Sequence, residues 1–378
     1  MKIAYFSGSI IPSLTANSIQ VMKMCQAMVQ NGHEPILYAV KGNDSLEGLS
    51  KDIWRHYGIR NKFDIHRMKN SPYLKGYDIA IASFLHARRK NVDMVFARNA
   101  VAAVLSSLFG YPTIYELHQV PGGRIGPSWL RLIVSGKGFV RLVAITHALK
   151  QALLSEYPGW LKNKEILVAH DAVDLERFDN LPSPEEARSK LNLPQKYTAG
   201  YSGSLYEGRG VELIMELAGV LPEVQFLIMG GDPGSVESRK EQAVARGIDN
   251  LIFFGFISNT ELPQYLAACN VLLMPYQKKI EVSGGGDTSK VFSPIKLFEY
   301  MASERLIITS NLEVLCEILN ENNSVLCDSA NLTEWQEAIQ RAYKGKMWGI
   351  SLTRQSRLDV ENYTWQVRVK KCLPVNLK

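Results

Sequence analysis

Short apolar runs alternate with longer amphipathic stretches along nearly the whole chain, and this alternation constrains the fold more than any other feature. Strands are expected at 2–7, 34–40, 94–97, 113–116, 141–145 and 165–169, and again at 197–202, 225–229, 251–254, 271–274 and 306–309. Helices are expected at 18–31, 78–90, 100–108, 147–157, 210–220, 235–246, 259–268, 294–303, 332–344 and 353–373. Strands that alternate with helices predict parallel sheets covered on both faces. Two such series predict an α/β protein with two doubly wound domains.

A segment rich in proline and charge separates the two series, and it contains the stretch LPSPEEARSKLNLPQK. We therefore expect a first domain over residues 1–172, a linker over 173–195 and a second domain over 196–350. The remaining residues, 351–378, are expected to form a C-terminal helix and tail.

Charge is distributed unevenly between the two halves of the 378-residue chain. Residues 1–170 contain 21 Lys and Arg against 10 Asp and Glu, a balance of +11, whereas residues 171–378 contain 22 against 27, a balance of −5. The halves therefore favour different electrostatic partners. The five cysteines form no CxxC pair, which argues against a zinc site or a disulfide framework. No run reaches the roughly 20 apolar residues of a membrane span, and the N-terminal run is too short for a signal peptide, so a cytoplasmic location is expected.

Ligands of doubly wound sheets bind at the carboxyl ends of the strands, so the loops that begin there are the candidate sites. The first loop, FSGSIIPSLTANS, lacks GxGxxG and the P-loop pattern, which argues against a dehydrogenase and a P-loop NTPase. In that loop Gly8, Ser9 and Asn17 could contact a ligand, or they could form a turn and a helix cap. The stretch YELHQ places Glu116 and His118 at another strand end, where the alternatives are ligand contact and a structural histidine.

Three strand ends in the second half carry glycines. In YSGSLYEGRGVE, Gly203 and Ser204 are followed by Arg209 at the start of a helix, a pattern that favours anion binding because N–H groups and a guanidinium converge. The stretches FLIMGGDPGS and FFGFIS are two further strand ends of this kind. Together these loops predict a bound flat or phosphorylated ligand.

The stretch SGGGDTSKVFSPIKLFEYMA contains the start of a helix, with Ser293 as the expected N-cap and Pro294 as the first helical residue. Lys296 then lies in the first turn, where the helix dipole disfavours a cation. A surface pair with Glu299 would not explain that position, whereas an anion held at the helix end would. Glu299, one turn further, is suited to the hydroxyls of a ribose.

These stretches resemble a known family, the retaining glycosyltransferases of family 4 with the GT-B fold. The resemblance rests on SIQVMKMCQAMVQNGHEP, AITHALK, VAHDAVDLERF, YSGSLYEGRGVELI and SPIKLFEYMAS, in this order. It implies two Rossmann-like domains that face each other across a cleft, with the C-terminal helix returning toward the first. It also implies a nucleotide-sugar donor, such as UDP-glucose, in the second domain and an acceptor in the first.

The resemblance implies roles for particular residues. Arg209 and Lys296 would meet the diphosphate, Glu299 the ribose and His118 the donor sugar. The remaining donor-binding residues expected are Gly8, Ser9, Gly203, Ser204, Gly231, Phe256, Ile257, Asp287, Val291, Phe292, Ser293, Pro294 and Ile295, and the acceptor-binding residues are Asn17 and Glu116. No metal ion is expected, because no acidic pair follows a strand.

Two departures from the family pattern matter. Val291 stands where the first glutamate of the E-x7-E motif is expected, and Ser204 stands where many members have a second arginine. Backbone N–H groups around Val291, with Asp287, would then have to hold the sugar hydroxyls.

The expected reaction is transfer of a hexose to a glycan or lipid-linked acceptor in polysaccharide biosynthesis, with retention of configuration and with the leaving phosphate accepting the proton. The alternatives left open are an NDP-sugar epimerase or another GT-B enzyme, a non-catalytic nucleotide-sugar-binding protein and a nucleic-acid-binding protein. The basic first half and the helix expected at 78–90 suggest peripheral contact with the inner face of the plasma membrane. A helix that packs against the core with a charged end is the simpler interpretation.

Overall fold

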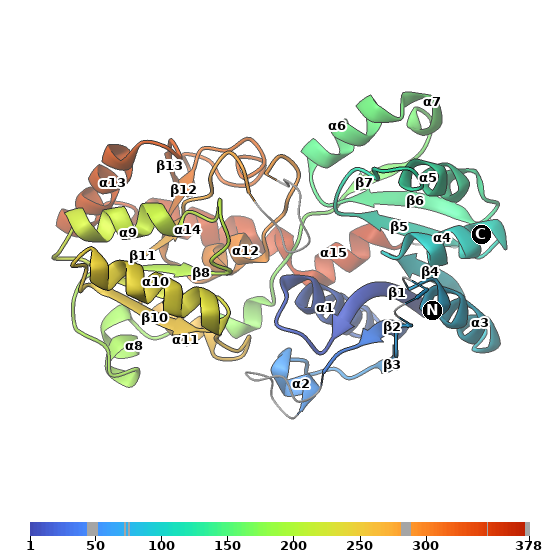
Figure 1. The fold of residues 1–378 in the computed structure, drawn as a ribbon, viewed down its shortest axis with the longest axis horizontal. Coiled ribbons are helices and arrows are strands. Elements are labelled where there is room, and N and C mark those ends of the chain that lie inside the picture. The colour runs from blue at the N-terminus through green and yellow to red at the C-terminus, as the bar shows by residue number, and fades with distance from the viewer. Residues whose placement is uncertain (44–51, 72, 75, 281–288, 346, 375–378) are drawn as a thin grey trace. The chain divides into compact units, whose positions relative to one another are not determined.

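The computed structural model describes residues 1–378 except 44–51, 72, 75, 281–288, 346 and 375–378. The chain forms two compact units (Figure 1). The first comprises Met1–Asp171 and Trp365–Lys378, and the second comprises Ala172–Thr364. Each unit is built on a parallel sheet with helices, so the predicted α/β fold with two doubly wound sheets is confirmed.

The first unit contains a seven-stranded sheet in the order β3-β2-β1-β4-β5-β6-β7. Its strands are β1 (Lys2–Ile11), β2 (Glu34–Lys41), β3 (Asp64–Met68), β4 (Met94–Ala97), β5 (Thr113–Leu117), β6 (Phe139–Ala144) and β7 (Ile166–Val168). The strand order reverses between β1 and β4, which are neighbours in the sheet. The loops after β1 and β4 therefore begin at the switch point, where sheets of this kind bind ligands.

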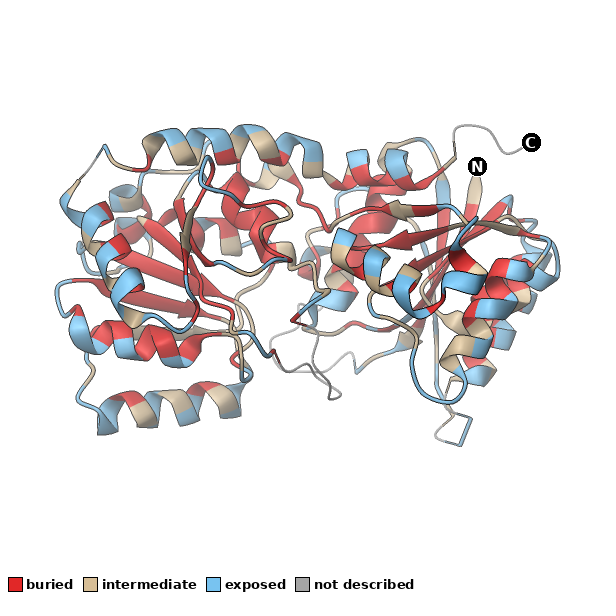
Figure 2. Ribbon diagram, turned by 90° about the horizontal axis from the view of Figure 1, so that it is seen from above, coloured by how far each residue is buried: buried red, intermediate tan, exposed pale blue. Residues whose placement is uncertain are grey.

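Helices cover both faces of this sheet. They are α1 (Ala16–Gln30), α2 (Ile53–His56), α3 (Tyr77–Arg89), α4 (Ala100–Leu108), α5 (Gly126–Ser135), α6 (His147–Glu156), α7 (Pro158–Leu161) and α15 (Trp365–Cys372). The helices α3, α4 and α5 pack in succession, and α1 packs against α15. Figure 2 shows the strands as largely buried and the outer faces of the helices as exposed. None of the described helices combines the length and the apolar character needed to cross a membrane.

The second unit repeats the scheme with a six-stranded sheet in the order β10-β9-β8-β11-β12-β13. Its strands are β8 (Thr198–Ser202), β9 (Gln225–Met229), β10 (Leu251–Gly255), β11 (Val271–Met274), β12 (Leu306–Ser310) and β13 (Val325–Cys327). Its helices are η1 (Leu175–Arg177), α8 (Pro184–Lys190), α9 (Val211–Val220), α10 (Pro233–Ala245), α11 (Leu262–Ala267), α12 (Ile295–Ala302), α13 (Leu332–Lys344), α14 (Ile350–Asp359) and η2 (Val360–Tyr363). Here the switch point lies between β8 and β11.

The segment 173–195, expected to be a linker, is instead folded into the second unit. Phe178 and Ala187 belong to the hydrophobic core of that unit. Arg188 is buried and donates to the backbone oxygen of Ala268 and the side chain of Asn270, each at 3.0 Å. The proline and the charged residues of segment 173–195 belong in part to a capped helix, because Ser183 and Glu186 form a capping box at the start of α8.

The C-terminal residues divide between the two units. α14 and η2 belong to the second unit, whereas α15 belongs to the first. On α15, Trp365 and Val369 are buried, and Arg368 donates to the backbone oxygens of Ala169 and His170 at the end of the main part of that unit. The single helix expected over 353–373 is therefore divided at residues 360–364. Its last part, α15, belongs to the first unit, which agrees with the expected return of the C-terminal helix.

Candidate functional site

The loop after β8 is held close to its neighbours by glycines. A Cβ atom on Gly230 would overlap the backbone oxygen of Gly203, and one on Gly210 would overlap that of Pro275. Both residues also have positive φ, 115° and 84°, which favours glycine. Because Gly230 and Gly210 have no side chain, the segment after β8 can lie close to the ends of β9 and β11.

Lys296 reaches this point from the first turn of α12. The N-cap of α12 is Pro294 rather than Ser293, so the expected Ser-Pro cap is wrong by one residue. The Lys296 ammonium donates to the backbone oxygen of Ser202 at 2.8 Å. It also lies 3.9 Å from the centroid of the Tyr201 ring and 4.6 Å from that of Tyr276. A carbonyl group and two aromatic faces thus stabilise a buried cation.

Arg209 lies beside Lys296 on the same tyrosine. Its Nη1 donates to the Tyr276 hydroxyl at 3.2 Å, and its guanidinium carbon lies 5.3 Å from the Tyr276 ring centroid. Its Nε is buried without a hydrogen-bond partner in the described part of the chain. Burial and then the charge of Arg209 hold the pKa of Lys296 well below its ordinary value, although Glu299 opposes the shift.

Neither cation has an ion-pair partner among the described residues. Two neighbouring cations at the carboxyl end of a parallel sheet, beside the first turn of a helix, form an electropositive site. Such a site stabilises an anion that carries more than one charge, because charge-assisted hydrogen bonds are strong where water is scarce. The sequence identified both cations but not Tyr276, whose only signal was its place two residues after a predicted strand.

Glu299 is buried one turn further along α12. Its Oε1 pairs with Nη1 of Arg177 at 3.1 Å, and Arg177 also donates to the backbone oxygen of Asn259. Its second oxygen, Oε2, has no hydrogen-bond partner within the described residues. The carboxylate is therefore held in place by Arg177 while one oxygen stays available for a ligand hydroxyl, so its role at a ribose stays a prediction.

Some of the other predicted donor residues of this unit contact the tyrosines that lie beside the two cations. Ser204 accepts from the Tyr201 hydroxyl through its backbone oxygen at 2.7 Å, and Phe292 packs edge-on against Tyr276 with ring centroids 4.8 Å apart. Gly231 has φ of 86° and no room for a Cβ beside Leu205. The half-buried residues are Phe256, Ile257, Val291, Phe292, Ser293, Pro294 and Ile295. Asp287 lies outside the described residues.

In the first unit, β1 continues through Ile11, so Gly8 and Ser9, expected in a loop, lie in the strand, where its pairing with β2 is irregular between Phe6 and Ile10. The Ser9 hydroxyl donates to Oδ1 of Asn17 at 3.0 Å, and Gly8 is exposed with nothing near its missing side chain. Thr15, not Asn17, caps α1. This hydrogen bond joins Ser9, near the end of β1, to Asn17, in the first turn of α1, at the switch point of the sheet. A role of the two residues in ligand binding stays a prediction.

Glu116 and His118 lie at the end of β5 and contact each other. The His118 Nε2 is 2.7 Å from Oε1 of Glu116, whose side chain is completely buried, whereas that of His118 is 30% exposed. Nε2 of Gln20 donates to the same oxygen at 2.9 Å, and Arg368 pairs with Oε2 at 2.9 Å. Direct contact between Glu116 and an acceptor, as the sequence suggested, is disfavoured because the carboxylate is enclosed by protein groups.

Charges balance within this buried cluster. Burial would raise the pKa of Glu116, but Arg368, His118 and Arg98 hold it well below its ordinary range. Burial raises the pKa of Asp171, which accepts from Gln20 at 3.0 Å, although Arg368 opposes that shift. Sequence reasoning missed Gln20, Arg98, Asp171 and Arg368, because nothing in their spacing indicates that they meet.

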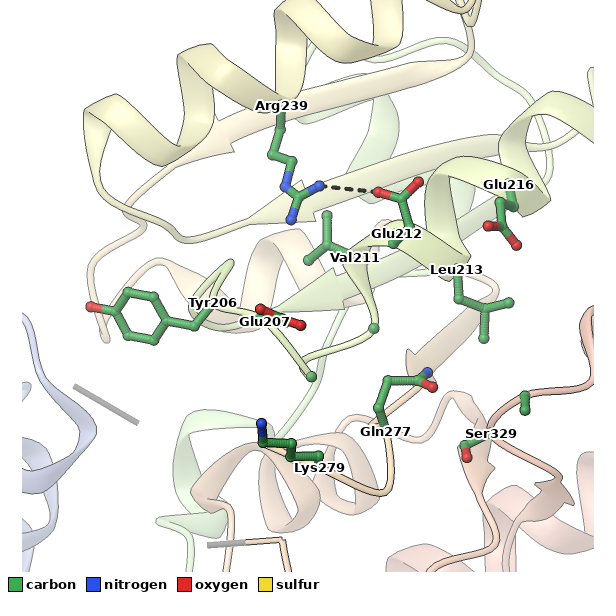
Figure 3. A pocket seen from close by; sticks show the side chains of 13 residues that line it. Tyr206, Glu207, Val211, Glu212, Leu213, Glu216, Arg239, Gln277, Lys279 and Ser329 are labelled. Carbon is green, nitrogen blue, oxygen red and sulfur yellow. Dashed lines mark hydrogen bonds and ion pairs between the residues drawn. The ribbon is translucent and has the colours of Figure 1, made fainter. Parts of the chain in front are cut away.

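A separate cavity of about 390 Å³ adjoins the loop after β8 (Figure 3). Figure 3 shows Glu207, Gln277 and Lys279 around it, with Glu212 bridged to Arg239 on α10. Arg209 and Lys296 do not line it. Within the described residues, no group of three or more His, Cys, Asp or Glu side chains is placed to hold a metal ion.

Two doubly wound sheets, with two cations at the switch point of the second, form a site suited to a phosphorylated ligand. The family described as "Glycosyl transferases group 1" matches residues 183–362, and "Glycosyltransferase Family 4" matches residues 18–177. The chain belongs to the group 1 glycosyltransferases, which confirms the family expected from the sequence, whereas retention of configuration stays a prediction.

Solved structures of the same fold match almost the whole chain. HepE from Anabaena, in complex with UDP-glucose, is 14% identical with a TM-score of 0.76 and covers 98% of both chains. WaaG, described as a glycosyltransferase involved in lipopolysaccharide biosynthesis, is 15% identical with a TM-score of 0.66 and covers 98% of both chains. At these identities the likeness shows the fold alone.

A curated relative matches a shorter part of the sequence. The 2-deoxystreptamine glucosyltransferase of Streptomyces kanamyceticus is 32% identical over 115 residues, which are 29% of this chain and 30% of that protein. The chain thus spans less than a third of this relative.

Proposed function

We propose that this protein transfers a hexose from a UDP-sugar, such as UDP-glucose, to a glycan or lipid-linked acceptor in polysaccharide biosynthesis. Configuration at the anomeric carbon is retained and no metal ion takes part. The observation that carries the proposal is the pair of cations, Arg209 and Lys296, which share Tyr276 and have no carboxylate partner among the described residues. The complex of HepE with UDP-glucose and the role of WaaG in lipopolysaccharide biosynthesis support this choice of donor and pathway.

The leaving diphosphate determines what the site has to do. Cleavage of the bond between the anomeric carbon and the phosphate oxygen leaves negative charge on that oxygen. Arg209 and Lys296 stabilise this charge, and they do so without a metal ion. The acceptor hydroxyl attacks the same face of the sugar, and its proton passes to the departing phosphate oxygen. Val291 supplies no nucleophile, which agrees with a reaction that needs none.

The surface of α3 supports an acceptor at a membrane. Tyr77, Ile81 and Leu85 are exposed on this helix by 37%, 48% and 45%, and Arg88 and Arg89 follow on its last turn. Exposed apolar and cationic side chains on one helix suit an anionic lipid surface. The protein would then act in the cytoplasm, in peripheral contact with the inner face of the plasma membrane.

The test is incubation of the purified protein with UDP-glucose in the presence of EDTA, with and without a membrane extract that contains lipid-linked glycans. We expect UDP release only with the extract, and a product whose anomeric configuration by NMR matches that of the donor. Isomerisation of UDP-glucose without extract would instead indicate an epimerase. An inverted product, or loss of turnover on adding EDTA, would contradict the proposed mechanism.

A further inference from the structure

The buried cluster around Glu116 contains more charge than a hydrophobic core normally tolerates. Glu116 and Arg368 have side chains that are 0% and 2% exposed, and Arg98, also in contact with Glu116, is 12% exposed. Buried charges of this kind persist where they are paired and fixed by further hydrogen bonds. His118 is the member of the cluster that is most exposed, and it lies directly after β5 at the carboxyl edge of the sheet.

The hydrogen bond between His118 and Glu116 determines which ring nitrogen carries the proton. Glu116 is ionised, because its cationic neighbours hold its pKa well below its ordinary range despite burial. An ionised carboxylate only accepts hydrogen bonds, so Nε2 of His118 has to be the donor in the 2.7 Å contact. Burial and the charge of Arg98 keep the pKa of His118 below its ordinary value, although Glu116 and Asp171 oppose the shift. The neutral ring therefore has its lone pair on Nδ1, which has no hydrogen-bond partner among the described residues.

Arg368 sets the position of Glu116 from the other side. Its Nη1 pairs with Oε2 at 2.9 Å, while its Nε donates to the backbone oxygen of His170 at 2.8 Å. Gln20 joins the two carboxylates of the cluster, donating to Glu116 at 2.9 Å and to Asp171 at 3.0 Å. Oε1 of Glu116 contacts His118 and Gln20, whereas Oε2 is ion-paired with Arg368 and has no hydrogen bond within the described residues.

We propose that Glu116 and Arg368 are positioning residues that hold His118 as the Nε2–H tautomer and leave Nδ1 to accept a hydrogen bond from a hydroxyl of the sugar substrate. The proposal rests on the proposed function, because it takes a sugar as the ligand of this strand end. It gives α15 a role in the site of the first unit, since the cation that completes the cluster comes from that helix. It also replaces the earlier interpretation of Glu116 as an acceptor ligand.

The groups that face His118 predict opposite effects of two substitutions. Glu116→Gln removes a charge that favours the imidazolium, so the pKa of His118 falls. Arg98→Gln removes a charge that disfavours it, so that pKa rises. Asp171, Arg368 and the amide of Gln20 complete the polar environment and are unchanged in both variants. If Glu116 and Arg98 served only in packing, the two substitutions would not shift the pKa of His118 in opposite directions.

The experiment is an NMR titration of the seven histidines in the full-length protein, with the His118 signal assigned by its loss in His118→Gln. We expect ¹⁵N shifts of an Nε2–H tautomer at neutral pH, a lower pKa in Glu116→Gln and a higher one in Arg98→Gln. Glu165→Gln is the matched control, because this half-exposed carboxylate pairs with Arg141 immediately before β7, at the opposite edge of the sheet. An Nδ1–H tautomer, or shifts of the same sign in both variants, would overturn the proposal.

Turnover supplies the second readout. The acid limb of the kcat/KM profile with UDP-glucose should move to lower pH in Glu116→Gln and to higher pH in Arg98→Gln. Residues that orient metal-binding histidines change affinity or activity by about 10- to 100-fold, and we expect effects of similar size here. Arg368→Met should lose activity in this range, and Arg368→Lys should regain part of it.

Unchanged kcat/KM in His118→Gln would overturn the contact with substrate. A protein without any turnover but with the expected titrations would contradict the proposed function and leave the tautomer assignment standing.

Discussion

The two units place cations at the same kind of position, the carboxyl edge of a doubly wound sheet, but they treat those cations in opposite ways. In the first unit Arg98 and Arg368 are paired with Glu116, and the charges are satisfied within the protein. In the second unit Arg209 and Lys296 contact a tyrosine and have no carboxylate partner among the described residues. A cation that is paired stabilises the fold, whereas one that is left without a partner is available for an anionic ligand.

The largest expected effect is on stability in the first unit. Arg368→Met leaves Glu116 buried with one cation fewer, so the free energy of unfolding should fall by about 3–5 kcal/mol. Chemical denaturation followed by circular dichroism measures it. The double variant Glu116→Gln/Arg368→Met should recover part of the loss, because no uncompensated charge remains. A loss below about 1 kcal/mol in the single variant would show that the pair does not hold the fold.

The corresponding change in the second unit should have the opposite character. Lys296→Met removes a buried charge that lacks a counter-ion, so the free energy of unfolding should change by less than about 1 kcal/mol or rise. The kcat/KM for UDP-glucose should fall by about 10²- to 10³-fold, the usual effect of losing one group that stabilises developing negative charge. Lys240→Met, an exposed lysine on α10, is the matched control and should leave both quantities unchanged. Strong destabilisation by Lys296→Met would remove the contrast between the units.

The glycines that bring the strand ends together give a smaller, purely structural effect. Gly210→Ala forces a side chain onto a residue with φ of 84° and against the backbone oxygen of Pro275, so we expect a loss of about 1–3 kcal/mol of stability. Gly8→Ala places a methyl group in open space near the end of β1 and should change stability by less than about 0.5 kcal/mol. Thermal unfolding of both variants is the measurement. Equal effects would contradict the tight packing of the loop after β8.

The smallest expected effect is an uptake of protons when UDP binds. Because the pKa of Lys296 is well below its ordinary value in the free protein, the lysine is charged at low pH and loses its charge as the pH rises through that lowered pKa. Binding of UDP favours the charged form, so above that pKa the complex should take up as much as about one proton. Calorimetry in buffers of different ionisation enthalpy measures this uptake. It should be absent in Lys296→Met, and uptake that persists there would assign the proton to another group.

The fold was predictable because apolar runs and amphipathic stretches alternate so regularly, and the exceptions have local causes. β3 (DIHRM) lies at the edge of its sheet, so polar residues interrupt its apolar pattern, and β13 is too short to give one. At the site, glycine-marked strand ends and a misplaced lysine indicated Arg209 and Lys296. Tyr276 and Arg368 could not be found in this way, because their roles depend on contacts between residues that are far apart in the sequence.

Calorimetric titration of the wild-type protein and Lys296→Met with UDP and with uridine measures whether the two cations without a carboxylate partner bind the diphosphate. We expect the wild type to bind UDP far more tightly than uridine, because only UDP carries the diphosphate that the two cations would contact. In Lys296→Met the affinity for UDP should fall by at least about 100-fold, while that for uridine stays the same. Equal affinity of the wild type for both ligands, or undiminished binding of UDP by the variant, would contradict binding of the diphosphate by the two cations.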